Sequence, residues 1–165
     1  VDATAVRDLL FGAVVALPVT SIVAGLLVSV FRTVPEAPLP PTGVAAGLAV
    51  QLLAGAIIAP IAEEAVFRGF AISAWRRTVG ERGAIVRASL LFAVAHVISV
   101  SATSPGEAVG LIVIGFASRL PVAFALAWLF VRTRSIWAPI GLHVAFNGIL
   151  LVLAELVTSG ALKAA

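Results

Sequence analysis

Long, uninterrupted apolar stretches are the feature of this sequence that most restricts its fold. Five stretches approach or exceed the ~20 residues that a helix needs to cross a bilayer. They are Leu9–Phe31, Val44–Trp75, Ala84–Ala102, Ala108–Val131 and Ile136–Thr158. The second is long enough to be tilted or broken, and none alternates as a barrel strand does. We therefore expect an all-α membrane protein, a bundle of about five transmembrane helices forming a single domain over residues 1–165.

The composition excludes several other classes of protein. The chain is 61% hydrophobic and 12% charged, whereas soluble domains carry about 25% charged residues. A chain of this size buries only about 70% of its unfolded surface, so a soluble monomer is excluded. The net charge of +3 includes no basic run that could follow phosphates, which argues against nucleic acid as a partner. Cysteine is absent, so thiolate metal sites and disulfides are excluded.

The arginines predict an orientation in the cell membrane. Five spans place the N-terminus, residues 76–83 and residues 132–135 on one side, with seven cations. The other side has two, Arg32 and Lys163. Because cytoplasmic loops carry the excess of Lys and Arg, we expect a multi-pass protein with a cytoplasmic N-terminus. The seven cations are Arg7, Arg76, Arg77, Arg82, Arg87, Arg132 and Arg134.

A small set of ionisable side chains remains inside the predicted spans. Each is costly in hydrocarbon unless it is paired or faces a polar cavity, so each is a candidate functional residue. His96 follows Arg87, and His143 follows Arg134, by the same nine residues, which places both ~13 Å deep. Glu63 and Asn147 are expected at ~20 Å. The full set is Glu63, Glu64, Arg68, His96, Arg119, His143 and Glu155.

Spacing within the spans supports one shared polar site. Glu64 and Arg68 are four residues apart and can pair on one helix face, while Glu63 points about 100° away. His143 and Asn147 have the same spacing and can face one cavity. Pro60 lacks a backbone N–H, so it is expected to kink the helix and free a carbonyl near residue 56.

Three short motifs give these residues a family resemblance. Residues 63–69 (EEAVFRG) resemble the EExxxR motif of the CPBP intramembrane proteases. Residues 92–96 (FAVAH) resemble their FxxxH motif, and residues 143–147 (HVAFN) their HxxxN/D motif. This family includes the type II CAAX prenyl endopeptidases (Rce1-like), the Abi proteins and bacteriocin-processing proteases. The resemblance covers about residues 50–150.

The resemblance implies an intramembrane endopeptidase that cleaves a membrane-associated peptide or protein. It implies a polar cavity that opens toward the cytoplasm. It assigns Glu63 as the catalytic base, with His96, His143 and Asn147 completing the catalytic site. Glu64 and Arg68 would be the supporting pair.

Two mechanisms are open for such a site. In a metal-free version, Glu63 and one histidine activate water, while Asn147 and the other histidine stabilise the oxyanion. In a metal version, Glu63, His96 and His143 bind Zn²⁺ and leave an open coordination position. The sequence has no HExxH, so a thermolysin-type site is excluded.

Other interpretations of the polar residues remain. A Glu/His/Asn cluster could serve a transporter or proton relay, although no repeat is evident in the sequence. An inactive scaffold of the same family is a further alternative. Arg119, just before Pro121, could pair with Glu155, line the cavity and bind a substrate carboxylate, or mark a helix break.

Overall fold

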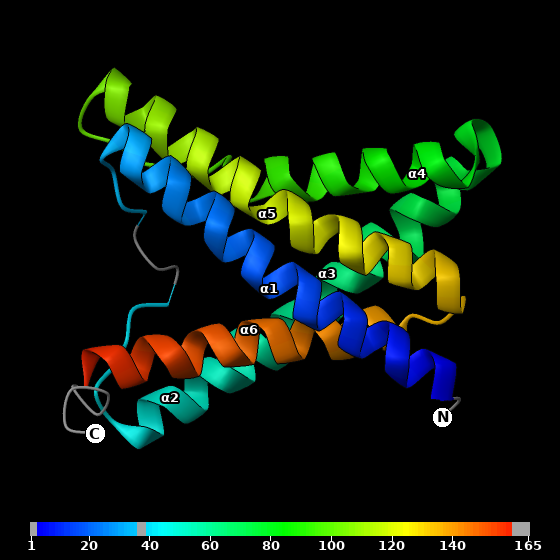
Figure 1. Cartoon of the computed structure of the whole chain (residues 1–165), viewed down its shortest axis with the longest axis horizontal. Helices are drawn as coiled ribbons and strands as arrows, with labels where there is room; N and C mark the ends of the chain where they lie inside the picture. The colour runs from blue at the N-terminus through cyan, green and yellow to red at the C-terminus, as the bar shows by residue number, and fades with distance from the viewer. Residues whose placement is uncertain (1–2, 36–38, 160–165) are drawn as a thin grey trace.

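A computed structural model describes residues 3–35 and 39–159, with side chains from residue 14 onward. Arg7 (side chain) and Lys163, used in the charge count, lie outside this description. All regular elements in the described part are helical (Figure 1). In chain order they are α1 (Ala3–Phe31), α2 (Ala45–Gln51), η1 (Leu52–Ile58), α3 (Ala59–Glu64), η2 (Ala65–Ile72), α4 (Ser73–Ala95), α5 (Pro105–Thr133) and α6 (Trp137–Thr158).

Four helical segments in the described residues are long and apolar enough to cross a membrane, where five were expected. They are Val14–Phe31, Ala45–Ala95, Pro105–Thr133 and Trp137–Thr158. The predicted spans 44–75 and 84–102 fall in the single run Ala45–Ala95. That run breaks at Gly80, whose φ of 71° and ψ of 178° are not helical. Figure 1 shows the chain turning back there, so one hydrogen-bonded run contains both predicted passes.

The turn at Gly80 replaces the predicted loop 76–83, and a positive φ is readily accessible only to glycine. Across this turn, the Arg76 guanidinium forms an ion pair with Glu81 at 2.7 Å. The returning part of α4 then ends at Ala95, seven residues before the predicted end at Ala102. The prediction failed here because residues 97–102 are as apolar as the helix itself. His96 therefore lies at a helix end.

The helix that carries the Glu pair is irregular on both sides of the pair. Two π-helical segments, η1 and η2, flank the short α3. Pro60 lies at the start of α3. In the π pattern, residue 59 donates its N–H to the carbonyl of Ala54, five residues back. The next donor in this pattern would be residue 60, so proline leaves the carbonyl of Gly55 without its helical partner.

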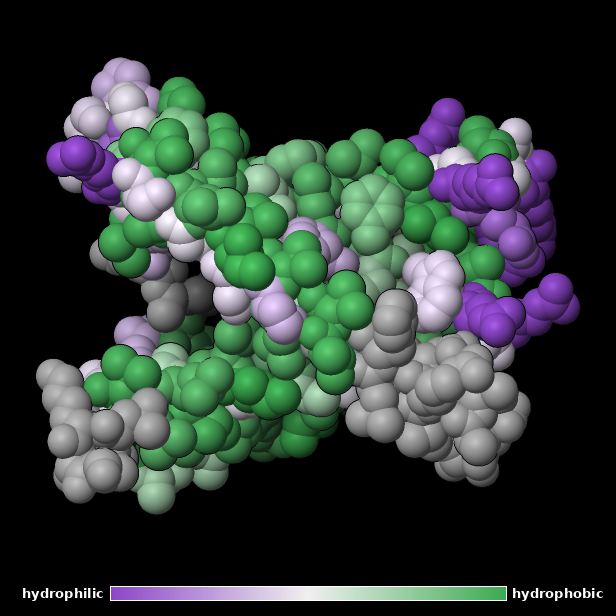
Figure 2. All heavy atoms as spheres, viewed as in Figure 1, coloured by the Kyte–Doolittle hydropathy of each residue, from purple (hydrophilic) through white to green (hydrophobic). Residues whose placement is uncertain are grey.

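Two groups of buried side chains position the other helices. In one, Ala16 of α1, Val122 and Leu126 of α5, and Leu142 and Phe146 of α6 pack together. The other joins η2, α4 and α5 through Ile72, Ala84, Ala88 and Ala127. Apolar side chains cover the middle of the molecule in Figure 2, and hydrophilic ones gather at its ends. This distribution is typical of a protein embedded in a bilayer.

Candidate active site

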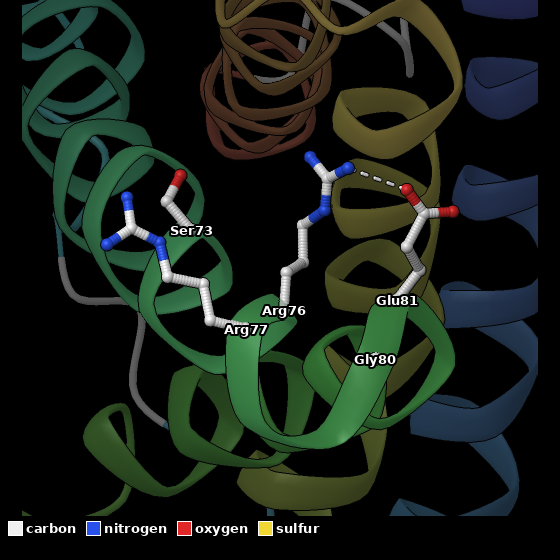
Figure 3. A pocket seen from close by; sticks show the side chains of 5 residues that line it. All are labelled: Ser73, Arg76, Arg77, Gly80 and Glu81. Atoms are coloured by element: carbon white, nitrogen blue, oxygen red, sulfur yellow. Dashed lines mark hydrogen bonds and ion pairs between the residues drawn. The ribbon is translucent and has the colours of Figure 1, made fainter.

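A cavity of about 610 Å³ brings the predicted polar residues together. Its walls come from α1, η1, α3, α4, α5 and α6. Glu63, His96, Arg119, His143 and Asn147 all line it. A second hollow lies at the Gly80 turn and is lined by Ser73, Arg76, Arg77, Gly80 and Glu81 (Figure 3). It contains none of the motif residues, so the first cavity is the candidate site.

Three side chains from three helices converge inside this cavity. Oε2 of Glu63 lies 3.7 Å from Nε2 of His143 and 3.9 Å from Nε2 of His96. This oxygen is buried and has no hydrogen-bond partner among the described residues. The Glu63 side chain is nevertheless 28% exposed. The carboxylate therefore reaches the cavity with one oxygen free to accept a hydrogen bond.

Glu64 is the centre of a buried network behind this site. Its Oε1 accepts hydrogen bonds from Arg68 Nη1 at 2.9 Å and from His143 Nδ1 at 2.8 Å. Arg68 also donates to the carbonyl of Ala123 at 3.1 Å, and its guanidinium lies 4.7 Å from the Phe92 ring centroid. Glu64 and Arg68 are fully buried. The pair that the i,i+4 spacing predicts thus also orients a histidine.

The hydrogen bonds of the two histidines define which ring nitrogen faces the cavity. His96 Nδ1 lies 2.8 Å from the carbonyl of Phe92, which can only accept, so Nδ1 carries the proton. His143 Nδ1 donates to Glu64 Oε1, which also accepts a hydrogen bond from Arg68. In the neutral rings, both Nε2 atoms are therefore acceptors, and both point toward Glu63.

Asn147 contacts the irregular helix rather than the other motif residues. Its Nδ2 donates to the carbonyl of Gly55 at 2.9 Å. This is the carbonyl that Pro60 leaves without a helical donor, one position from the predicted residue 56. Asn147 thereby stabilises the π-helical segment just before the Glu pair, and it still lines the cavity.

Arg119 lies in the cavity wall and does not pair with Glu155. Oε2 of Glu155 instead accepts a hydrogen bond from the backbone N–H of Thr42 at 3.0 Å. Within the described part of the chain, Arg119 makes one long hydrogen bond, from Nη1 to the carbonyl of Gly115 at 3.4 Å. Of the alternatives for Arg119, the structure supports a cavity-lining position.

The donor set has the composition of a catalytic zinc site, with two imidazole nitrogens and one carboxylate oxygen. As arranged, however, no group of three or more His, Cys, Asp or Glu side chains in the described residues could hold a metal ion. The residues therefore do not fit Zn²⁺ in this conformation, and we assign no step to a metal. Zinc dependence stays a prediction for experiment.

The cavity extends away from the arginine-rich end of the molecule. Its outer lining includes Ala24 near the end of α1 and Leu150 and Ala154 near the end of α6. The Gly80 turn and the N-terminal end of α1 lie at the opposite end (Figure 1). Figure 2 shows the molecule hollowed between two lobes at the end away from that turn. The cytoplasmic N-terminus and the cytoplasmic opening of the cavity both stay predictions.

Hydroxyl groups complete the wall in a way that sequence reasoning missed. Thr20 and Ser21 of α1 and Ser118 of α5 line the cavity. The Thr20 hydroxyl oxygen is buried and has no hydrogen-bond partner in the part of the chain that the structure describes. The only signal in the sequence was a hydroxyl residue inside an apolar span, which is too common to select a site.

These observations define an α-helical membrane protein with a polar, carboxylate-and-histidine site enclosed among its helices. The sequence model described as Type II CAAX prenyl endopeptidase Rce1-like matches residues 45–149. The chain therefore belongs to the Rce1-like family of membrane-embedded, CAAX-type endopeptidases. Searches of curated proteins and of solved structures found no significant match.

Proposed function

We propose that this chain hydrolyses a peptide bond of a membrane-associated substrate, with Glu63 as the base that activates water. The observation that supports the proposal best is the convergence of one free Glu63 oxygen with the Nε2 atoms of two histidines in a cavity. Family membership supports the general activity, while this assignment of residues is our own.

The reaction would begin with a water held between Glu63 and the two imidazoles. Because the Nε2 atoms are acceptors, one histidine can accept a hydrogen bond from the second proton of the water, while the first proton points to Glu63. Glu63 removes a proton as the water oxygen attacks the carbonyl carbon. The same proton then passes to the amide nitrogen as the C–N bond breaks, which restores the carboxylate.

Glu64 and Arg68 would act behind the reacting groups. Arg68 donates a hydrogen bond to Glu64, and Glu64 keeps the proton of His143 on Nδ1. This arrangement holds the Nε2 lone pair in the cavity throughout the reaction. Asn147 would secure the helix that carries Glu63 through its bond to Gly55.

Cleavage of lipid-anchored peptides by the full chain in proteoliposomes tests the proposal. We expect Glu63→Gln and His96→Ala to lose activity by on the order of 10²–10⁴-fold, the usual contribution of acid–base catalysis. Arg77→Gln, an exposed arginine at the Gly80 turn, is the matched control and should cleave normally. Undiminished turnover in both site variants would contradict the proposal.

A further inference from the structure

The site as described is rich in acceptors and poor in donors. A tetrahedral intermediate places negative charge on the former carbonyl oxygen, and hydrogen-bond donors must meet it. In their neutral forms, His96 and His143 present only lone pairs to the cavity, since both rings donate through Nδ1 elsewhere. One N–H of Asn147 is committed to Gly55. Among the motif residues, only the second N–H of Asn147 is then left to meet the full negative charge of the oxyanion.

Arg119 supplies what the motif residues lack. It lines the same cavity as Glu63 and both histidines. Its guanidinium has five N–H donors, and in the described residues only one is used, in a long bond to Gly115. The fully buried arginine, Arg68, is occupied by Glu64 and Ala123. Among the described lining residues, Arg119 is the permanent cation.

We propose that Arg119 donates hydrogen bonds to the oxyanion of the tetrahedral intermediate, an inference that rests on the proposed endopeptidase function. As Glu63 takes the proton from water, negative charge leaves its carboxylate and appears on the substrate oxygen. A fixed guanidinium in an apolar cavity attracts that charge before and after the transfer. The cavity then keeps one anion and one cation at each stage.

Charge balance also separates this role from the binding of a substrate carboxylate. Glu64 and Arg68 already neutralise each other. A carboxylate bound to Arg119 would leave Glu63 as a second, uncompensated anion in the same apolar cavity. The arrangement therefore favours an anion that forms only when Glu63 becomes neutral.

Steady-state cleavage by Arg119→Gln tests the assignment, with Arg77→Gln as the exposed-arginine control. We expect kcat to fall by on the order of 10²–10³-fold while KM stays unchanged, as when one oxyanion donor is removed. Arg119→Lys should recover part of kcat. Added guanidinium should rescue Arg119→Ala, which a merely structural role would not allow.

Binding measurements supply a second readout. A phosphinic peptide, whose tetrahedral oxygens mimic the intermediate, should bind Arg119→Gln more weakly by the factor lost in kcat/KM. The uncleaved peptide should bind equally to Glu63→Gln and to the double variant that combines Glu63→Gln with Arg119→Gln. The inference would be overturned by a loss confined to KM that disappears with a C-terminally amidated peptide or after Glu→Gln changes within the peptide. Arg119 would then bind the terminal or side-chain carboxylate of the substrate.

The two proposals fail separately. Cleavage that survives Glu63→Gln would overturn the proposed function. Cleavage that is lost in Glu63→Gln but retained in Arg119→Gln would overturn only the role of Arg119.

Discussion

The two histidines of the site stand in different walls of the same cavity. His143 is 4% exposed in its side chain, and its Nδ1 bonds a buried carboxylate that an arginine also holds. His96 is 25% exposed, lies at the end of α4, and bonds only a carbonyl of its own last turn. The same chemical group is thus fixed by a buried ionic network on one side and by local backbone on the other.

The difference indicates a division between a rigid wall and an adaptable one. The wall of α3 and α6 is preorganised, because moving His143 would break its bond to the fully buried carboxylate of Glu64. The wall formed by the end of α4 has fewer constraints, so it can adjust to a substrate. The predictions below test this comparison.

Breaking the buried pair should have the largest effect. Glu64→Gln removes the partner of Arg68 and leaves an uncompensated charge at a site with no exposure. We expect a loss of about 3–5 kcal/mol in the free energy of unfolding. Thermal unfolding in detergent measures it. Glu64→Gln combined with Arg68→Met should be more stable than the single variant, and equal loss in both would show that the unpaired Arg68 charge is not the cause.

Replacing each histidine by alanine compares the walls directly. His143→Ala should lower stability by about 1.5–3 kcal/mol, since it loses a hydrogen bond to a charged group. His96→Ala should cost only about 0.5–1.5 kcal/mol. Unfolding curves and cleavage rates of both variants check this. Equal destabilisation would argue against a rigid and an adaptable wall.

The contact between Asn147 and Gly55 should contribute less. Asn147→Ala leaves the Gly55 carbonyl without a partner, at an expected cost of about 1 kcal/mol. In a Pro60→Ala background, residue 60 regains an N–H that can reach this carbonyl in the π pattern, so the same change should cost less. A double-mutant cycle on unfolding free energies measures the coupling. Strict additivity would show that the proline does not create the need for Asn147.

Chelation should have the smallest effect. The three candidate ligands are not arranged to hold a metal ion in the described structure, so activity should survive a chelator series unchanged. Cleavage assays before and after dialysis against each chelator check this. Loss of activity that added Zn²⁺ restores would support the metal mechanism and require the adaptable wall to move His96 toward Glu63.

Much of the helical framework follows from the sequence. The bounds of α5 and α6 and the end of α1 lie close to the predicted stretches, because those stretches end at charges or turn residues. Ser104 illustrates this, since its hydroxyl accepts the N–H of Glu107 and caps α5 just before Pro105. The end of α4 at Ala95 was missed, because hydropathy does not distinguish a helix that stops at membrane depth from one that continues.

The site was predicted less evenly. Spacing and depth brought Glu63, His96 and His143 to one cavity, and helical periodicity gave the Glu64–Arg68 pair. His143 and Glu64, which are in contact, lie 79 residues apart in the sequence. No local sequence pattern predicts such a contact. The tautomers of both rings follow from such contacts, so the sequence could not show that the histidines are acceptors.

The early end of α4 has a consequence for the surrounding lipid. From Glu81 to Ala95 the returning helix is 15 residues, or ~22 Å, against a hydrocarbon core of ~30 Å. Beyond Ala95 the chain forms turns over residues 96–99 instead of a regular helix, and lipid tails do not solvate backbone groups that a turn leaves unpaired. Because this helix is shorter than the hydrocarbon core, we expect the membrane to be thinner beside it. A membrane-associated peptide would then meet His96 with little hydrocarbon left to cross.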